Sequence, residues 1–364
     1  EGIGYGDYVG QISFLLFLKM DEERTEYLGE PSLIPAEYQW ATIRGKTGEA
    51  LDQHYKKALS ELAKRGYPEH MALGTLAGAG TLGLLIPPSI IMIVYGVAAN
   101  VSIAQLFIAG VLPGILLAGL FMGYTMVWAL FNPGKIPPAG PSMTFVQKLN
   151  ASRNLLPVVA LIGAVLGSVY SGLATATESA ALGVVGALVL AAMQGSMSWK
   201  QFRESLLGAS RLYCMIALIL AGAAFLTLSM GYIGLPRHLA EWIGSLGMSQ
   251  LQLIVALMAF FIVLGCFLDG ISIVVLTMGV LLPTIEKAGI DPIWFGIFVV
   301  LVVEMAQVTP PVGFNLFVLQ GMTGKEITYL AKHALPMFLL MVAAVLLIYF
   351  VPGIVTWLPA QMVG

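Results

Sequence analysis

The sequence predicts an all-α, polytopic membrane protein, and three observations carry that prediction. Of its 364 residues, 58% are hydrophobic and 10% are charged, whereas a typical soluble domain carries about 25% charged residues. Residues 71–364 contain, one after another, apolar runs long enough to cross a bilayer. Two of these runs are interrupted by paired prolines, Pro87-Pro88 and Pro310-Pro311. The lipid bilayer is therefore the expected environment, and a soluble enzyme, a nucleic-acid-binding protein and a disordered chain are excluded.

Apolar runs separated by polar or helix-breaking residues predict the order of the membrane segments. Residues 68–98 and 292–320 are expected to form helices broken in the middle, and residues 251–267 and 272–285 to form the arms of a re-entrant hairpin. Residues 199–208 predict a separate amphipathic connector. The remaining runs predict unbroken spans at 106–130, 155–172, 178–195, 212–231 and 329–350.

A shift of 223 residues superimposes the two Pro-Pro pairs without a gap and predicts two related halves. The same shift pairs Gly66 with Gly289 and Pro113 with Pro336. Prolines and glycines in register are a more specific signal than matched leucines, which are common in any membrane protein. The expected organisation is a polar segment of doubtful homology at 1–58, a first repeat at 59–130, a cytoplasmic connector at 131–153 and a second repeat at 154–364.

Positive charge orients the segments, because cytoplasmic loops collect Lys and Arg. If residues 251–285 form a re-entrant hairpin, 16 of the 18 Lys and Arg residues lie on one face, and only Arg237 and Lys287 lie elsewhere. The two repeats are then inverted, an arrangement common in secondary transporters. If residues 251–267 cross fully instead, 15 of these residues lie inside and the repeats are parallel. The count of positive residues barely distinguishes the re-entrant topology from the full crossing, so the hairpin prediction rests on the symmetry of an inverted repeat.

Each Pro-Pro pair removes two backbone donors from its helix and frees carbonyls of the preceding turn. At membrane depth those carbonyls need protein, water or an ion as a partner, and broken helices are where transporters bind substrate and coupling ions. Small residues and neutral oxygens surround both breaks, and the candidates are Gly80, Thr81, Ser89, Thr309, Gly313 and Asn315. The alternative is that each pair is only a packed kink.

Three of the acidic residues within or beside apolar runs are candidates for a functional or structural role. Asp269, next to Gly270 and Ser272, lies between the hairpin arms; a carboxylate at membrane depth is a functional candidate, and an ordinary interfacial loop is the alternative. Glu304 is interpreted as a buried residue that ties the second broken helix to a neighbour, with an ion or proton ligand as the alternative. Glu178 is interpreted as a helix-start carboxylate and, with Glu304, as candidate buried polar support for the site.

Other motifs carry little weight. Residues 78–83 match Gly-x-Gly-x-x-Gly, but they follow no predicted strand, so close helix packing is expected there instead of dinucleotide binding. Cys214 and Cys266 lie in apolar runs and provide neither a disulfide framework nor a metal cluster. The sequence therefore predicts no cofactor and no enzymatic activity, and any transport must draw its energy from a gradient or from another chain.

Several motifs resemble the large membrane subunit of the TRAP (tripartite ATP-independent periplasmic) transporters over about residues 59–352. They are specific together, although none is specific alone. The motifs are Arg65-Gly66-Tyr67-Pro68, Gly80-Thr81-Leu82-Gly83, Ile86-Pro87-Pro88-Ser89, Phe107-Ile108-Ala109-Gly110, Thr175-Ala176-Thr177-Glu178, Phe267-Leu268-Asp269-Gly270, and Thr309-Pro310-Pro311-Val312-Gly313 followed by Asn315.

The resemblance implies an elevator-type secondary transporter of the bacterial inner membrane that imports an organic acid with Na⁺. The substrate would be a C4-dicarboxylate, sialic acid or a similar carboxylate. A periplasmic binding protein would deliver it, and a small four-helix membrane subunit would pair with this chain. Of the residues that the resemblance implies for the site, Asp269, Ser272 and Thr309 are the expected Na⁺ ligands. The full set is Gly80, Thr81, Pro87, Ser89, Asp269, Gly270, Ser272, Thr309, Pro310, Gly313 and Asn315.

The N-terminal part departs from the family pattern. The family has scaffold helices and a first hairpin before Gly66, and the repeat shift places that hairpin at about residues 43–65. Residues 46–57 are charged and cannot lie at membrane depth. Residues 1–58 are therefore expected to be foreign or mis-joined sequence, or the subunit has lost half of its site. The alternative function is a non-transporting membrane scaffold or an inactive, truncated remnant of such a subunit.

Overall fold

The structure is a computed structural model that describes residues 68–135, 156–193, 195, 197–311 and 313–361. The predictions for residues 1–58, for the beginning of the first repeat and for most of the connector 131–153 lie outside these residues. The described residues form thirteen α-helices and one short 3-10 turn, with no strand among them. The all-α prediction is confirmed for this part of the chain.

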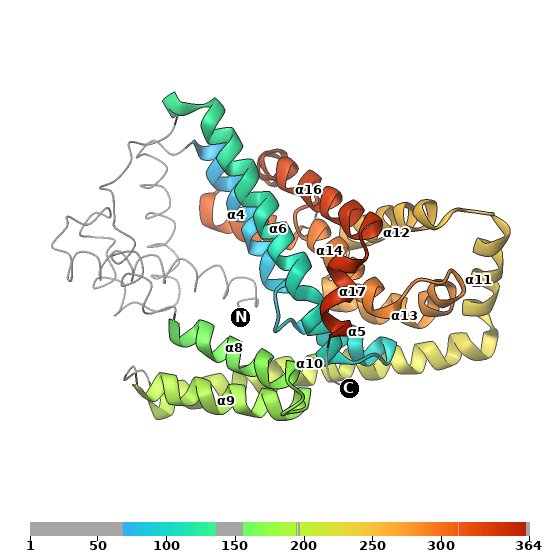
Figure 1. Ribbon diagram of the computed structural model, residues 1–364, viewed down its shortest axis with the longest axis horizontal. Helices are drawn as coiled ribbons and strands as arrows, with labels where there is room; N and C mark the ends of the chain where they lie inside the picture. The colour runs from blue at the N-terminus through green and yellow to red at the C-terminus, as the bar shows by residue number, and fades with distance from the viewer. Residues whose placement is uncertain (1–67, 136–155, 194, 196, 312, 362–364) are drawn as a thin grey trace. The chain divides into compact units, whose positions relative to one another are not determined.

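Figure 1 labels the helices in chain order. The two broken helices are α4 (Glu69–Leu85) with α5 (Ile90–Ala99), and α14 (Pro292–Gln307) with α15 (Phe314–Thr323). The arms of the predicted hairpin are α12 (Gln250–Gly265) and α13 (Gly270–Lys287). The other elements are α6 (Ile103–Phe131), η2 (Pro133–Lys135), α8 (Leu156–Tyr170), α9 (Ala176–Met193), α10 (Trp199–Ile233), α11 (Leu235–Ser245), α16 (Ile327–Phe350) and α17 (Gly353–Ala360).

Several of these helices suit a lipid bilayer. By length and composition, four helices in the described residues can cross a membrane: α6, α10, α13 and α16. The pair α4 and α5, bent by 43° at its break, makes a fifth. A hydrocarbon core of about 30 Å needs about 20 apolar residues in a helix. The described chain is therefore a polytopic helical membrane protein.

The described helices belong to two compact units. Unit 1 contains α4 up to Gly83, α6 from Ala118, α15, and α16 up to Leu340. Unit 2 contains the rest of α4 and α6, all of α5, α8 from Pro157, all of α9 to α13, α14 up to Ala306, and the remainder of α16 with α17. Each broken helix thus contributes one half to each unit.

In unit 1, α4 packs against the first half of α16 through glycines. A Cβ added at Gly78 would lie 2.9 Å from Met337 Cγ, and one at Gly74 would meet the backbone oxygen of His333. Small residues four positions apart allow two helix backbones to approach closely. Gly78 begins the Gly-x-Gly-x-x-Gly motif, which therefore lies in a helix–helix contact, as predicted.

In unit 2, α14 is the centre of the core, with every residue from Trp294 to Ala306 buried. It packs on α5, where the Tyr95 hydroxyl donates to the Pro292 carbonyl at 2.7 Å. It also packs on the second half of α16, where Trp294 Nε1 donates to the Ile348 carbonyl at 3.0 Å. A helix that is apolar on all sides is stable when it is surrounded by other helices, and α14 occupies such a position.

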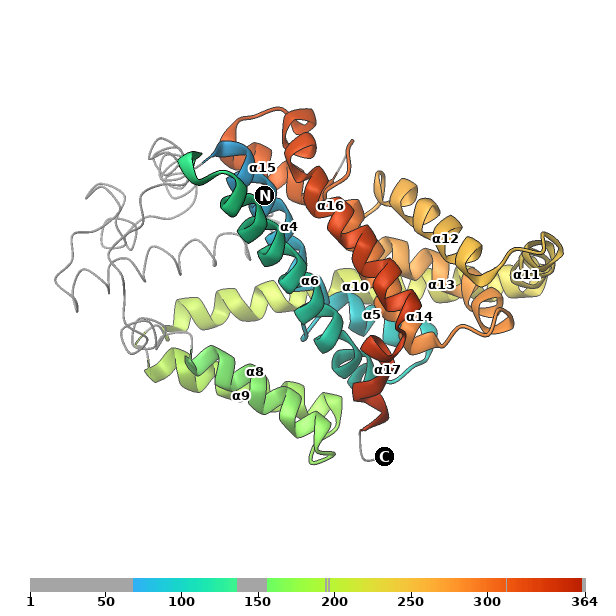
Figure 2. The same ribbon diagram turned by 45° about the horizontal axis from the view of Figure 1, so that its top comes forward.

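Helices α8 and α9 run side by side as a hairpin (Figures 1 and 2). The Ser168 and Ser179 hydroxyls bond each other at 2.8 Å across the pair. A Cβ at Gly183 would touch Val165 Cγ2 at 3.3 Å, so the glycine permits the close approach. The predicted spans 155–172 and 178–195 are confirmed as helices.

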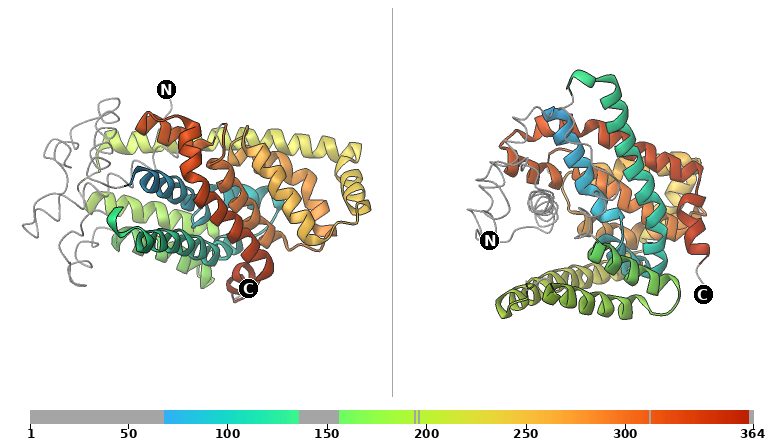
Figure 3. Two further views of the ribbon diagram at one scale, coloured as in Figure 1. Left: turned by 90° about the horizontal axis from the view of Figure 1, so that it is seen from above. Right: turned by 60° about the vertical axis from the view of Figure 1, so that its left-hand side comes forward.

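The separate connector predicted at residues 199–208 is wrong. Residues 199–233 form one continuous helix, α10, which Figure 3 shows as an unbroken ribbon. It begins at a capping box in which the Ser198 and Gln201 side chains each bond the other's backbone N–H. A lone glycine weakens a helix by about 1 kcal/mol without ending it, so Gly208 does not interrupt the helix. The end is set by Gly234, which has a positive φ of 78°.

The helices around the two breaks follow the 223-residue shift. Moved by that shift, α4 would cover 292–308, where α14 covers Pro292–Gln307, and α5 would cover 313–322, where α15 covers Phe314–Thr323. Pro113 and Pro336 lie inside α6 and α16, and both Pro-Pro peptide bonds are cis. The helix boundaries agree with the predicted register, while the inversion of the repeats stays a prediction.

Candidate functional site

The first helix break ends on a buried serine that begins α5. Pro87 and Pro88 have no N–H to offer the carbonyls of the last turn of α4. Ser89 is 1% exposed, and its Oγ accepts a hydrogen bond from the backbone N–H of Met92 at 3.4 Å. This hydroxyl serves as the N-cap of α5, and it places a neutral oxygen at the break.

The predicted hairpin tip is organised by Asp269, which is the N-cap of α13. One carboxylate oxygen accepts the backbone N–H groups of Ile271 at 3.1 Å and Ser272 at 3.3 Å, and the other accepts the Ser272 hydroxyl. The residue is exposed. A carboxylate has about four acceptor positions, so Asp269 keeps capacity for a further donor or a cation after capping the helix.

The hairpin tip and the first break are brought together in unit 2. A Cβ at Gly270, the first residue of α13, would lie 2.9 Å from Cδ1 of Ile91, the second residue of α5. The same Cβ would lie 2.5 Å from Val303 Cγ1 on α14. Only glycine allows this approach. The N-termini of α5 and α13, with Ser89 and Asp269 as their caps, are therefore neighbours.

The second break turns sharply at Gly313 in unit 1. The Gly313 N–H donates to the Thr309 carbonyl at 3.0 Å. A Cβ on this glycine would lie 2.8 Å from that carbonyl oxygen and 2.9 Å from the carbonyl oxygen of Gln307. The turn packs so tightly that it requires glycine. It brings the chain directly into α15, whose first turn has no side-chain cap.

Asn315, in that first turn of α15, has a buried amide nitrogen with no hydrogen-bond partner among the described residues. The nitrogen lies close to α4, since a Cβ at Gly80 would be 3.3 Å from it. Thr81, next to Gly80 on α4, is fully buried, and its hydroxyl donates to the Gly78 carbonyl at 2.7 Å. Buried donors without partners are rare in proteins, so the Asn315 amide is a candidate ligand-binding group.

The predicted residues thus fall into two groups, one in each unit. Thr309 belongs to unit 1, whereas Asp269 and Ser272 belong to unit 2, so the shared Na⁺ site expected for these three residues stays a prediction. The group in unit 2 is Pro87, Ser89, Asp269, Gly270 and Ser272. The group in unit 1 is Gly80, Thr81, Thr309, Pro310, Gly313 and Asn315.

The two glutamates have different surroundings. Glu178 is exposed at the start of α9, so its prediction as buried support is wrong, whereas its prediction as a helix-start carboxylate is confirmed: Oε2 accepts the backbone N–H and the hydroxyl of Thr175, each at 2.8 Å. This is a reciprocal cap, because Thr175 Oγ1 accepts the Glu178 N–H at 3.3 Å. Glu304 is fully buried in α14, and neither carboxylate oxygen has a hydrogen-bond partner in the described part of the chain.

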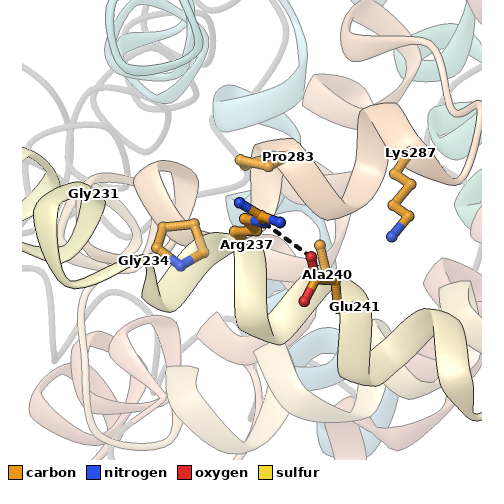
Figure 4. A pocket seen from close by; sticks show the side chains of 8 residues that line it. Gly231, Gly234, Arg237, Ala240, Glu241, Pro283 and Lys287 are labelled. Carbon is orange, nitrogen blue, oxygen red and sulfur yellow. Dashed lines mark hydrogen bonds and ion pairs between the residues drawn. The ribbon is translucent and has the colours of Figure 1, made fainter.

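A cavity of about 340 Å³ lies away from the predicted residues, between the end of α10, α11 and the end of α13 (Figure 4). Arg237 Nε donates to Glu241 Oε1 at 2.9 Å on its wall, and this bond lowers the pKa of the Glu241 carboxyl. Lys287 lines the opposite side. No motif indicates this cavity. The only available signal was that Arg237 and Lys287 are the two basic residues outside the positive face.

Broken helices with polar groups at the breaks are a feature that secondary transporters share, and the described residues contain two such helices in a polytopic membrane protein. Comparison with known families agrees. The family model described as "Tripartite ATP-independent periplasmic transporter, DctM component" matches residues 57–354. The chain therefore belongs to the DctM family of TRAP transporter large permease components.

Curated relatives cover most of the chain. It is 32% identical over 303 residues to the C4-dicarboxylate TRAP transporter large permease protein DctM of Pseudomonas aeruginosa, which covers 83% of this chain and 70% of the relative. It is 30% identical to the isethionate TRAP transporter permease protein DctMQ of Oleidesulfovibrio alaskensis (80% of this chain, 46% of the relative). It is 29% identical to the ectoine/5-hydroxyectoine large permease protein UehC of Ruegeria pomeroyi (82% and 69%).

Proposed function

We propose that this chain is the large membrane subunit of a Na⁺-coupled transporter that imports an organic acid across the bacterial inner membrane. The observation that carries the proposal is a chemical division between the two breaks. The break in unit 2 gathers oxygen atoms, and the break in unit 1 presents hydrogen-bond donors. A cation and an anionic substrate need these two kinds of group.

The oxygen-rich group in unit 2 suits Na⁺. Hard cations take oxygen ligands, and Ser89, Asp269 and Ser272 supply hydroxyl and carboxylate oxygens at neighbouring helix N-termini. A helix N-terminus carries partial positive charge, which the Asp269 carboxylate offsets. No group of three or more His, Cys, Asp or Glu residues gathers in the described residues, so the donor set suits a monovalent ion better than a transition metal.

The donor-rich group in unit 1 suits a carboxylate. No side chain caps the first turn of α15, so the leading N–H groups of this helix, before the Leu316 N–H that bonds the Gly313 carbonyl at 2.8 Å, are open to a ligand, and the Asn315 amide adds a buried donor. Helix N-termini bind anions without a basic side chain. The organic acid would be held here, with Gly80 leaving room beside the amide. The relatives named above are assigned C4-dicarboxylate, isethionate or ectoine, so the class is small polar or anionic solutes.

The exchange of helices between the repeats supports an inverted-repeat architecture. In unit 1, α4 of the first repeat packs on α15 and α16 of the second, and in unit 2, α14 of the second repeat packs on α5 and α6 of the first. Contacts of this reciprocal kind arise when a two-fold axis relates two similar parts. We infer alternating access by an elevator-type movement, in line with the family resemblance.

The proposed partners follow from the same family. A periplasmic binding protein would deliver the substrate, and a small four-helix membrane subunit would complete the complex. The relative DctMQ leaves more than half of its own length outside the match with this chain, which is consistent with a second membrane component fused to it.

The test is substrate uptake into proteoliposomes that contain the chain, the small membrane subunit and the binding protein. Uptake is expected only with a Na⁺ gradient and only with all three components. A C4-dicarboxylate and isethionate are the first labelled substrates to compare. Uptake that is unchanged when Na⁺ is replaced by K⁺ would refute the coupling. Failure of every carboxylate with an intact complex would favour the scaffold alternative.

A further inference from the structure

Glu304 is a buried acid that the proposed transport site does not use. It is 0% exposed on α14, and both carboxylate oxygens lack a hydrogen-bond partner among the described residues. The backbone of Leu85, the last residue of α4, is a polar neighbour of the carboxyl, although the two form no regular hydrogen bond. Its side chain therefore reaches the first helix break, while its own backbone lies five residues before Thr309 at the second break.

The repeat shows that a carboxyl is not needed to build such a broken helix. The shift of 223 residues places Thr81 opposite Glu304. Thr81 is equally buried, but its hydroxyl bonds the Gly78 carbonyl within its own helix. The first half-helix thus satisfies this position with a short polar side chain. The second half-helix instead carries an ionisable group with no partner.

Titratable groups occur on several elements that pack against α14, and none of them acts on the Glu304 carboxyl. The Tyr95 hydroxyl donates to the Pro292 carbonyl, at the other end of α14. The Asp269 carboxylate is occupied in capping α13. The halves of α4 and α6 in unit 2 carry no titratable side chain. The groups on the packed elements are Tyr95 on α5, Cys266 after α12, Asp269 before α13, Glu286 and Lys287 at the end of α13, Asp291 before α14 and Tyr349 on α16.

We propose that Glu304 is a proton-binding site, holding a proton while its carboxyl is buried against Leu85 at the first helix break. A bare carboxylate in a dry core without a counter-charge is strongly disfavoured, so the closed packing needs the neutral acid. Loss of the Leu85 contact would admit water, and the Oε–H bond would then break, with the proton passing to water and the carboxylate remaining. Protonation of Glu304 would thereby be linked to whether its carboxyl stays packed against Leu85 at the first helix break.

A proton fits this site better than an alkali ion. A metal cation needs several oxygen ligands at once, and the described surroundings of Glu304 supply no second carboxylate and no hydroxyl in bonding contact. A proton needs only the carboxyl itself. The inference does not depend on the substrate or on Na⁺ coupling, so it can fail while the proposed transport function holds.

Infrared spectroscopy of the purified full chain in lipid nanodiscs tests the proposal, because a neutral carboxylic acid has its own carbonyl band. The wild-type protein should show this band at neutral pH, Glu304→Gln should lack it, and the matched control Glu286→Gln, at an exposed site on α13, should keep it. Identical wild-type and Glu304→Gln spectra would overturn the proposal. Loss of the band on adding Na⁺ at constant pH would overturn it too, by assigning an alkali-ion site.

Thermal unfolding provides an independent readout. The folded state would bind one more proton than the unfolded chain above the ordinary range of a glutamate, so stability should fall as pH rises. Glu304→Gln cannot lose a proton and should show a smaller fall in unfolding temperature than the wild type and Glu286→Gln. Equal falls in all three proteins would contradict the proposal. If Glu304→Gln does not fold, Glu304→Asp should shift the infrared band, and an unshifted band would exclude Glu304 as its source.

Discussion

Asp269 combines two properties that a single substitution can separate. It caps α13 through two backbone N–H groups, and its carboxylate keeps acceptor capacity for a cation. Asparagine caps a helix about as well as aspartate but carries no charge. A change to asparagine therefore removes the charge and leaves the cap.

We predict that Asp269→Asn raises the Na⁺ concentration needed for half-maximal uptake about tenfold, equivalent to about 1.4 kcal/mol of lost binding. Uptake as a function of Na⁺ concentration in proteoliposomes measures this. The matched control is Asp291→Asn, because Asp291 also caps a helix, accepting the Trp294 N–H at 2.9 Å, but lies outside both candidate groups. Equal effects of the two substitutions would show that Asp269 acts only as a cap.

Asn315 supports a prediction about the substrate. Its unpaired amide nitrogen is a donor, and aspartate at this position would present acceptor oxygens and a negative charge instead. Asn315→Asp should raise the KM for a carboxylate substrate about tenfold or more, since like charges repel in a desolvated site. The measurement is uptake as a function of substrate concentration, with Asn132→Asp, at the end of α6, as the control. An unchanged KM would remove Asn315 from the substrate site.

The motifs found in the sequence located Asp269, Ser89 and Asn315, because these residues lie close to helix-breaking prolines or glycines. Their contacts could not be predicted. Gly270 meets Ile91 across nearly 180 residues of chain, and such an approach depends on tertiary packing. The Arg237–Glu241 pair near Lys287 was missed because a cavity wall assembled from three helices leaves no local pattern.

At the level of elements, the turn at Gly313 determines how α15 begins. The backbone oxygens of Thr309 and Gln307 leave no space for a Cβ there. Gly313→Ala should therefore destabilise the protein by about 1–3 kcal/mol, the usual cost of overpacking, and lower its unfolding temperature.

Gly321→Ala is the control for this prediction. Gly321 lies in the same helix, α15, and a Cβ there would meet nothing within 4 Å. Alanine favours a helix over glycine by about 1 kcal/mol, so this variant should be as stable as the wild type or more stable. Thermal unfolding of both variants in the same nanodiscs measures the difference. Equal stability of the two variants would contradict the tight turn.

Helix α10 illustrates which features of an element are local. Its capping box and its glycine stop are local signals, and both lie near the predicted ends. The predicted division at residues 208–212 failed because a change from polar to apolar residues does not break a helix. Its 35 residues extend about 52 Å at 1.5 Å per residue, which exceeds a hydrocarbon core of about 30 Å. The basic first turns, with Lys200, Arg203 and Arg211, are therefore expected to project from the positive face.

At the scale of the whole molecule, composition and breakers were sufficient to predict a helical membrane protein with two broken helices. The division of each broken helix between the two units could not be predicted. A sequence shift pairs related segments, but it does not say which of them are in contact. The membrane topology of α12 and α13 depends on the same symmetry. A re-entrant hairpin makes the repeats inverted, and a full crossing of α12 makes them parallel.

Thiol labelling from one side of the membrane distinguishes these topologies. In a background with Cys214 and Cys266 replaced by serine, Ser245→Cys precedes α12 and Glu286→Cys lies at the end of α13, both at exposed sites. We predict that a membrane-impermeant reagent labels both from the same side, because α12, at 16 residues, is shorter than the roughly 20 residues a full crossing needs. Lys200→Cys, on the positive face, should be labelled from the opposite side. Labelling of Ser245→Cys and Glu286→Cys from opposite sides would refute the hairpin, and with it the inverted repeat.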